Sequence, residues 1–108
     1  MNRIDLPQGT LDLLVLRVLR GGEMHGWGIA QRLSLVSNDA LQLQEGTLYP
    51  ALYRMEGKGW IESEWAASEN NRRAKYYRLT KVGRKQLDAH KESWDRLAAV
   101  VAQVMQKA

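Results

Sequence analysis

The sequence predicts an α+β fold, mainly α, in which a winged helix-turn-helix is followed by a long C-terminal helix. Three observations predict it: helical apolar spacing in the first 59 residues, two alternating segments between residues 60 and 79, and a heptad pattern in the last 22. A chain of 108 residues is the size of one domain. We expect the winged helix-turn-helix to occupy residues 1–80 and the long C-terminal helix to occupy residues 81–108, in one compact unit.

The first helix should begin at Thr10, whose hydroxyl can cap a free backbone N–H, and should end at Gly21-Gly22. Its apolar residues recur at spacings of three and four: Leu11, Leu14, Val15, Val18 and Leu19. Because Leu13 and Leu16 lie on a different face, this helix is expected to be buried on two sides.

A second helical pattern runs from about His25 to Val36 and is broken by residues 37–39. The alternation in Leu41–Gln44 predicts a very short strand or an extended connection. A third helix should run from Gly46-Thr47 to Gly57. Pro50 is tolerated only in the first turn of that helix, where its missing N–H has no intrahelical partner, so the helix should start close to Glu45–Thr47.

Two strands forming a hairpin are expected next, at Trp60–Trp65 and Lys75–Leu79. The nine residues between them, Ala66 to Ala74, make a long loop whose tip should protrude. Thr80 then caps a final helix that runs to the end of the chain.

The final helix carries a heptad seam, which needs a partner helix. We expect self-association through this seam, since two-fold proteins match two-fold DNA sites. The alternative is that the seam packs only on the first helix of its own chain, and the two-sided apolar pattern of that helix favours both packings together. The predicted dimer interface consists of Leu11, Leu87, His90, Trp94, Leu97, Val101 and Val104.

The net charge of +4 is unevenly distributed. Residues 1–71 carry a net charge of −3, residues 86–108 carry none, and residues 72–85 hold seven Lys or Arg with no acidic residue. A concentrated basic segment directly after a helix-turn-helix pattern indicates a polyanionic partner, here double-stranded DNA.

The third helix would be the one that enters the major groove, with its first turn offering free N–H groups to phosphates. Its predicted DNA-facing residues are Gln44, Gly46, Thr47, Tyr49, Pro50, Tyr53 and Arg54, beside Glu45. The plainer alternative is that Tyr49 and Tyr53 form an ordinary surface aromatic pair. Arg72, Arg73 and Lys75 end the hairpin loop, where a wing reaches the flanking backbone, whereas Arg78, Lys81, Arg84 and Lys85 cannot be assigned.

Trp94 and His90 at the middle of the seam are most simply structural. In the functional alternative, two Trp94 rings flank a cavity between subunits, where a planar aromatic small molecule could stack. Trp94 is therefore the candidate ligand-binding residue.

Catalysis is poorly supported, because the chain has no Cys and only two His, His25 and His90. Glu62 and Glu64 share one face of an exposed hairpin, where they are more readily solvated than bound to a metal. We expect no enzyme activity, no cofactor and no metal. The apolar runs are far shorter than the roughly 18 residues that span a bilayer, and no signal region follows Met1, so the expected location is the cytoplasm, without membrane contact.

Five segments in unbroken order carry a family resemblance: Gly9-Thr10-Leu11, Met24-His25-Gly26-Trp27-Gly28-Ile29-Ala30, Glu45-Gly46-Thr47-Leu48-Tyr49-Pro50-Ala51-Leu52, Gly59-Trp60-Ile61 and Lys75-Tyr76-Tyr77-Arg78-Leu79-Thr80. They resemble the PadR family of bacterial transcriptional regulators, in its short form with a single C-terminal helix. Position 27 departs from the pattern, with Trp where Tyr is commoner.

The resemblance implies a winged-helix domain, a dimer built through the C-terminal helix, and repression of nearby genes. It places Thr47, Tyr49 and Pro50 at the DNA, and Arg72, Arg73 and Lys75 at flanking phosphates. In drug-sensing members a Trp of the C-terminal helix stacks on flat ligands, a place that Trp94 could take. The expected function is a dimeric repressor that binds an inverted repeat; the alternatives are an aromatic-ligand sensor and, as a different class, a winged helix that binds protein through an acidic or apolar wing.

Overall fold

The structure, a computed structural model, describes residues 6–108. Seven elements follow one another: α1 (Gln8–Arg20), β1 (Met24–His25), α2 (Gly26–Val36), α3 (Glu45–Gly57), β2 (Ile61–Ala67), β3 (Arg73–Leu79) and α4 (Lys81–Lys107). Four helices and one small antiparallel sheet confirm the predicted α+β, mainly α, winged helix-turn-helix with a long C-terminal helix. No helix of this part of the chain is long and apolar enough to cross a membrane.

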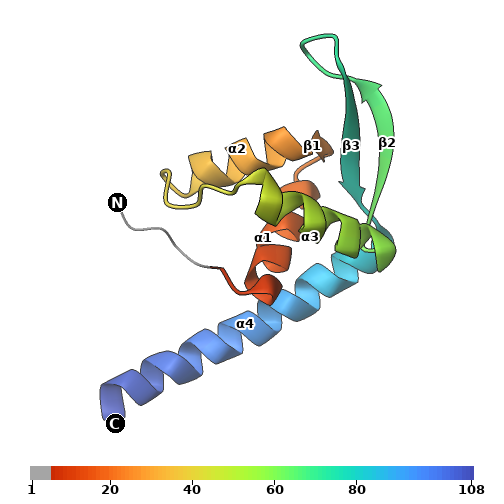
Figure 1. Ribbon diagram of the computed structural model, residues 1–108. Coiled ribbons are helices and arrows are strands. Elements are labelled where there is room, and N and C mark those ends of the chain that lie inside the picture. Colours follow the sequence, from red (N-terminus) through yellow and green to blue (C-terminus); the bar gives the residue numbers. More distant parts are fainter. Residues whose placement is uncertain (1–5) are drawn as a thin grey trace.

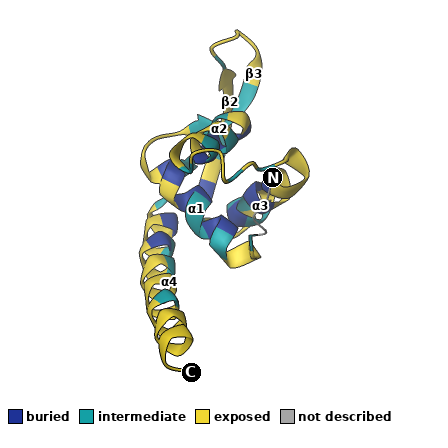
Figure 2. Ribbon diagram, turned by 90° about the vertical axis from the view of Figure 1, so that its left-hand side faces the viewer, coloured by how far each residue is buried: buried dark blue, intermediate teal, exposed yellow. Residues whose placement is uncertain are grey.

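The helices α1, α2 and α3 pack together, and the β2–β3 hairpin and α4 extend away from them in different directions (Figure 1). The two extensions give the molecule principal dimensions of 55 × 35 × 21 Å. The core lies where the three helices meet the base of the hairpin and the start of α4 (Figure 2). Its largest fully buried side chains are Val15, Leu16, Ile29, Leu48, Leu52, Met55 and Ile61.

The sheet has the strand order β1-β3-β2, and its antiparallel hairpin pairs Ile61 with Leu79 at the base and Ala67 with Arg73 near the tip. Because side chains alternate along a strand, the hairpin has two distinct faces. The inner face carries Ile61, Ser63, Trp65 and Ala67 on β2 and, opposite them, Leu79, Tyr77, Lys75 and Arg73 on β3. Buried Ile61 and Tyr77 belong to the core, so the tip of this face continues the core side of the sheet outward.

The start of α1 differs from the prediction. The helix begins at Gln8, with Pro7 as its N-cap residue and no side-chain cap, so Thr10 lies inside the first turn rather than before it. The Pro7 carbonyl accepts the hydrogen bond of the Leu11 N–H at 3.0 Å, which sets the helix start three residues earlier. The predicted end is confirmed, since the helix stops at Arg20 and Gly22 takes a φ of 140°.

Of the two alternatives for Leu41–Gln44, the very short strand is wrong, and the segment is a connection without regular secondary structure between α2 and α3. Its alternation reflects the packing of Leu43 on the core. The strand that pairs with β3 is instead Met24–His25, which meets Tyr77 and Tyr76. Two residues are too few to show a period in the sequence.

Pro50 also departs from its expected position. The helix α3 begins at Glu45, as expected, but this places Pro50 in the second turn, inside the helix. The carbonyl of Gly46, four residues earlier, therefore receives no helical N–H from position 50. The expected nine-residue hairpin loop is shorter, because β2 and β3 extend further and leave only residues 68–72.

Thr80 caps α4 as predicted, with its Oγ1 accepting a hydrogen bond from the Gly83 N–H at 3.0 Å. The same hydroxyl donates toward the carbonyls of Gly59 at 2.6 Å and Trp60 at 3.0 Å, which fixes the helix start to the base of the hairpin. A Cβ on Gly83 would stand 2.0 Å from the Trp60 carbonyl oxygen, so only glycine allows this approach.

Leu11 and Leu87 were predicted to lie in a dimer interface, but both are buried in the core of their own chain. The first turns of α4 pack on α1, and this intramolecular contact covers the two side chains. The first part of the heptad seam therefore anchors α4 to its own domain, and only the later part can face another molecule.

Candidate nucleic-acid interface

The exposed face of α3 carries most of the residues predicted to face DNA. Gln44, Gly46, Thr47, Tyr49, Pro50 and Tyr53 are all exposed, and Tyr53 is 82% accessible. Gly46 has nothing within 4 Å of the position of a Cβ, so the backbone of the first turn is open. The side chain of the N-cap residue Gln44 makes no capping hydrogen bond. The helix start can therefore approach another molecule closely.

Arg54 does not join this face, which corrects its predicted role. Its guanidinium donates a hydrogen bond to the carboxylate of Asp12 in α1, and the Asp12 side chain is almost fully buried. Burial raises the pKa of Asp12, although the positive charges of Arg54, Lys58 and His90 oppose this. The Nε of Arg54 is also buried, without a hydrogen-bond partner among residues 6–108. Arg54 thus links α1 to α3 from inside the domain.

The tip of the hairpin is basic. Arg72 and Arg73 are exposed there, and the Arg73 guanidinium lies 5.8 Å from the centre of the Trp65 ring. Lys75 is half-buried nearer the base, with its Nζ 3.7 Å from a carboxylate oxygen of Glu56. The structure therefore places Arg72 and Arg73 at the tip without an acidic partner among residues 6–108, and it pairs Lys75 with Glu56.

On the outer face of the hairpin, acidic side chains surround Arg78. Arg78 donates hydrogen bonds to Glu62 at 2.7 Å and to Glu64 at 2.8 Å, and Glu23 lies 3.8 Å away. These carboxylates raise the pKa of Arg78 above its ordinary value. Because Arg78 is neutralised in this way, the basic segment of the sequence presents its charge at the tip and inner face of the hairpin, and at the start of α4.

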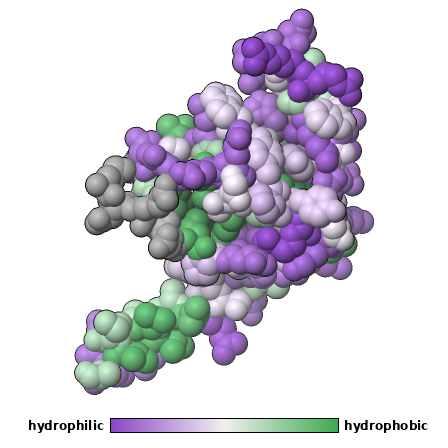
Figure 3. Space-filling model, in the orientation of Figure 1, coloured by the Kyte–Doolittle hydropathy of each residue, from purple (hydrophilic) through white to green (hydrophobic). Residues whose placement is uncertain are grey.

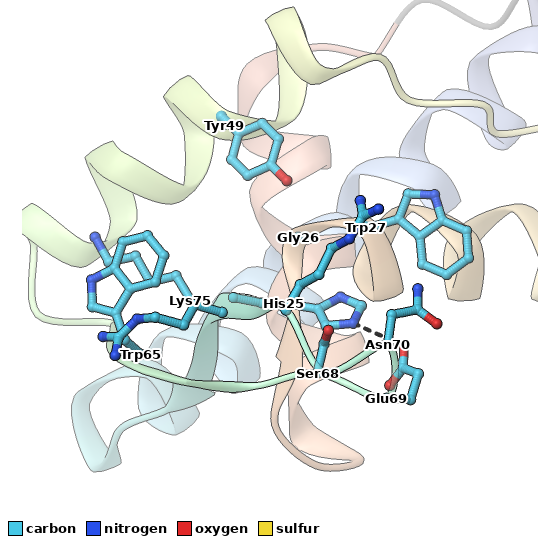
Figure 4. Close-up of a pocket in the computed structure, with 12 residues that line it drawn as sticks. His25, Gly26, Trp27, Tyr49, Trp65, Ser68, Glu69, Asn70 and Lys75 are labelled. Carbon is cyan, nitrogen blue, oxygen red and sulfur yellow. Dashed lines mark hydrogen bonds and ion pairs between the residues drawn. The ribbon is translucent and has the colours of Figure 1, made fainter.

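A cleft of about 390 Å³ separates the hairpin tip from the first turn of α2 and from Tyr49 of α3 (Figure 4). We call it the wing cleft. It is lined by His25, Gly26, Trp27, Tyr49, Trp65, Ser68, Glu69, Asn70, Arg72, Arg73, Ala74 and Lys75. Sequence reasoning did not assign His25, Trp27 or Trp65 to this site. Of these three residues, only Trp65 could have been found from the sequence, because it belongs to the alternating pattern that predicted the strand β2.

His25 joins the tip of the hairpin to α2. Its Nδ1 accepts a hydrogen bond from the Gly28 N–H at 2.9 Å, so the other ring nitrogen, Nε2, carries the proton that faces Glu69 at 3.3 Å. This hydrogen bond lowers the pKa of the Glu69 carboxyl. The ring also lies 5.2 Å from the ring of Tyr76, centre to centre. His25 thus caps α2 and holds one side of the wing cleft.

The C-terminal half of α4 exposes an apolar stripe (Figure 3). Its members are Trp94, Leu97, Val100, Val101, Val104 and Met105, which include four of the predicted interface residues and add Val100 and Met105. His90, one turn before, is half-buried and meets Trp60 edge to face, with ring centres 5.8 Å apart. His90 thus packs within its own chain, whereas Trp94 leaves 47% of its surface exposed to solvent.

Comparisons with known proteins agree with this architecture. The sequence matches the transcriptional regulator PadR-like family over residues 15–89. It is 30% identical to Transcriptional regulator Rv3488 of Mycobacterium tuberculosis over 97 residues, which cover 90% of this chain and 87% of that protein. A solved transcriptional regulator from Clostridium thermocellum superposes with a TM-score of 0.82 at 29% identity, covering 89% of this chain and 93% of the other.

A PadR family transcription regulator from Clostridium difficile gives a TM-score of 0.75 at 34% identity, covering 88% of this chain and 97% of that one. The named relatives are regulators of transcription. The chain belongs to the PadR-like family and is a transcriptional regulator, not an enzyme.

Proposed function

We propose that the protein is a dimeric repressor that binds an inverted repeat in double-stranded DNA. The observation that carries this proposal is the common orientation of two features: the exposed face of α3 and the basic tip of the hairpin both border the wing cleft. A recognition helix in the major groove and a wing on the neighbouring backbone need this arrangement. Residues 1–80 would bind DNA, and residues 81–108 would dimerise.

Specificity would come from Gln44, Thr47, Tyr49 and Tyr53, whose side chains stand on the open side of α3. Affinity would come from Arg72 and Arg73, which neutralise phosphates and release counterions. Gly46 and Pro50 would let the backbone of the helix start approach the duplex, where the positive end of the helix dipole favours a phosphate.

Dimerisation would use the apolar stripe of α4. Residues 94–105 present six large apolar side chains to solvent, an arrangement that a second helix would cover. A two-fold dimer would place two recognition helices on successive major grooves, which explains why we infer an inverted repeat. Since the target is chromosomal DNA, the protein would act in the cytoplasm.

A second candidate function is control by a planar aromatic small molecule at Trp94. The half-exposed indole at the centre of the stripe favours it, because two such rings would face each other in the dimer. Titration calorimetry with a planar aromatic cation tests it: binding should disappear in Trp94→Ala. Binding that survives this substitution would rule out Trp94 as the stacking surface.

The main proposal is tested by an electrophoretic shift with the duplex upstream of the protein's own gene, at about 150 mM salt. We expect a discrete shifted band that an unlabelled copy of the duplex removes and a scrambled duplex does not. Equal competition by both duplexes would contradict sequence-specific binding.

A further inference from the structure

We propose that Trp65 binds DNA, with its indole ring packed against the sugar–phosphate backbone of the strand that crosses the wing cleft. The inference deepens the proposed function and rests on it. It adds to the charged wing contacts an apolar one, made by a residue on the strand β2 rather than in the loop.

The position of Trp65 follows from the alternation of β2. Ile61, four residues earlier on the same face, is buried in the core, whereas Trp65 is 58% exposed. The inner face of the hairpin therefore runs from the core past the edge of the helices and presents the indole on the side of α3. The outer face at the same level carries Glu64 and Tyr76 instead, so the ring lies on the basic side of the hairpin.

The surroundings of Trp65 combine an apolar surface with positive charge. Lys75 is its cross-strand partner, and the Arg73 guanidinium lies 5.8 Å from the ring centre. A cation held by an aromatic face loses little freedom when it then meets an anion. A DNA backbone offers apolar sugar edges alternating with phosphates. The sugar edges would pack on the Trp65 ring, and the phosphates would pair with the Arg73 guanidinium.

The opposite wall of the wing cleft is also aromatic. Tyr49 is 41% exposed and packs on Gly26, where a Cβ would stand 2.6 Å from the tyrosine oxygen. Trp27, 60% exposed, stands at the other end of the cleft from Trp65 (Figure 4). Rings from α2, α3 and β2 thus border one space, as in channels that hold nucleic-acid strands between aromatic side chains and cations.

Among residues 6–108, the wing cleft has a single acidic side chain in its lining, so its electrostatic repulsion of an anionic strand is weak. Glu69 is the acidic residue among the cleft-lining side chains, and its carboxylate accepts the hydrogen bond of the His25 Nε2–H. Against it stand Arg72, Arg73 and Lys75, of which Lys75 is shared with Glu56. The balance in the cleft is positive, which suits a phosphate-bearing chain and not a cation.

The test is a salt titration of DNA affinity for the full-length chain and for Trp65→Ala, using the upstream duplex and fluorescence anisotropy. The substitution removes no charge, so the number of neutralised phosphates should not change. We expect Trp65→Ala to bind about tenfold more weakly than the wild type at every salt concentration. The slope of log affinity against log salt should be the same for both chains. Trp65→Phe should recover most of the loss, because it restores an aromatic surface.

Leu35→Ala is the matched control, since Leu35 is a large, exposed apolar side chain of α2 outside the cleft, and its affinity should equal that of the wild type. A smaller salt slope in Trp65→Ala would mean that the ring only holds the wing arginines in place, which would overturn the inference. Unchanged affinity in Trp65→Ala would overturn it as well. If the wild-type chain binds no duplex at any salt concentration, the proposed function itself fails.

Discussion

The carboxylate of Asp12 in α1 accepts a hydrogen bond from the guanidinium of Arg54 in α3, and this ion pair is a polar link between the two helices. Asp12 is only 3% exposed, in the middle of the apolar face of α1. An ionised group so buried is stable only when it is paired. The orientation of α3 therefore depends on a contact that lies behind the surface proposed to face DNA.

Asp12→Ala should destabilise the fold by about 2–3 kcal/mol, because it leaves the half-buried Arg54 charge without its partner. Urea unfolding followed by circular dichroism measures the effect. The matched control is Lys91→Ala, which breaks the exposed pair of Lys91 with Asp95 at 2.7 Å and should cost about 0.5 kcal/mol or less. Equal losses in the two variants would show that the Asp12 pair is no stronger than a surface contact.

The pH dependence of stability should reveal the raised pKa of Asp12. Because burial favours the protonated carboxyl in the folded state, the stability that Asp12 contributes is full below its ordinary pKa of 3.8 and is lost as the pH rises through the raised value. The free energy of unfolding of the wild type minus that of Asp12→Asn should therefore fall with pH in this window and then level off. A difference that rises with pH would mean that pairing with Arg54 outweighs burial.

Arg72→Ala combined with Arg73→Ala should weaken binding to specific and scrambled duplexes by similar factors. Each lost phosphate contact lowers the salt slope by about 0.9, so the double variant should lose about two units per bound chain. Both arginines are exposed at the hairpin tip and lie outside the core, so the melting temperature should change little and serves as the control. An unchanged salt slope would show that Arg72 and Arg73 do not contact phosphates, which would exclude the hairpin tip from the proposed DNA interface.

Much of the fold was predictable because its determinants are local. Apolar spacing, Thr80 and the alternating strands predicted α2, α3, the hairpin and α4 within a few residues of their observed bounds. The β1 strand was missed because two residues carry no period, and its existence depends on pairing with β3. Whether a seam residue such as Leu87 faces its own domain or another chain is decided by tertiary packing.

The site was predictable only where side chains project from a regular element into solvent. Thr47 and Tyr53 stand on the open face of α3, as the helical period indicated. Arg54, one residue further along the helix, turns inward because Asp12 lies across the helix–helix contact, 42 positions away in the sequence. The wing cleft could not be predicted from the sequence, since it is formed by three segments that are distant along the chain.

Leu97→Glu should dissociate the proposed dimer without unfolding the chain, because Leu97 is 60% exposed on the α4 stripe and does not belong to the core of its own domain. Sedimentation velocity should show a species of half the mass, with an unchanged far-UV spectrum. Leu87→Ala provides the contrast: its side chain is in the core, so it should cost about 2–5 kcal/mol of folding stability. A wild-type chain that already sediments as a monomer would contradict the role given to the stripe.

Hydroxyl-radical footprinting on the upstream duplex distinguishes a dimeric, sequence-specific repressor from the alternatives, since it reports both the symmetry and the spacing of the contacts. We expect two protected half-sites related by a two-fold axis, with centres about one or two helical turns (~10 or ~20 base pairs) apart, at two chains per duplex. A single protected segment bound by one chain, or uniform protection along the whole duplex, would contradict a dimeric, sequence-specific repressor.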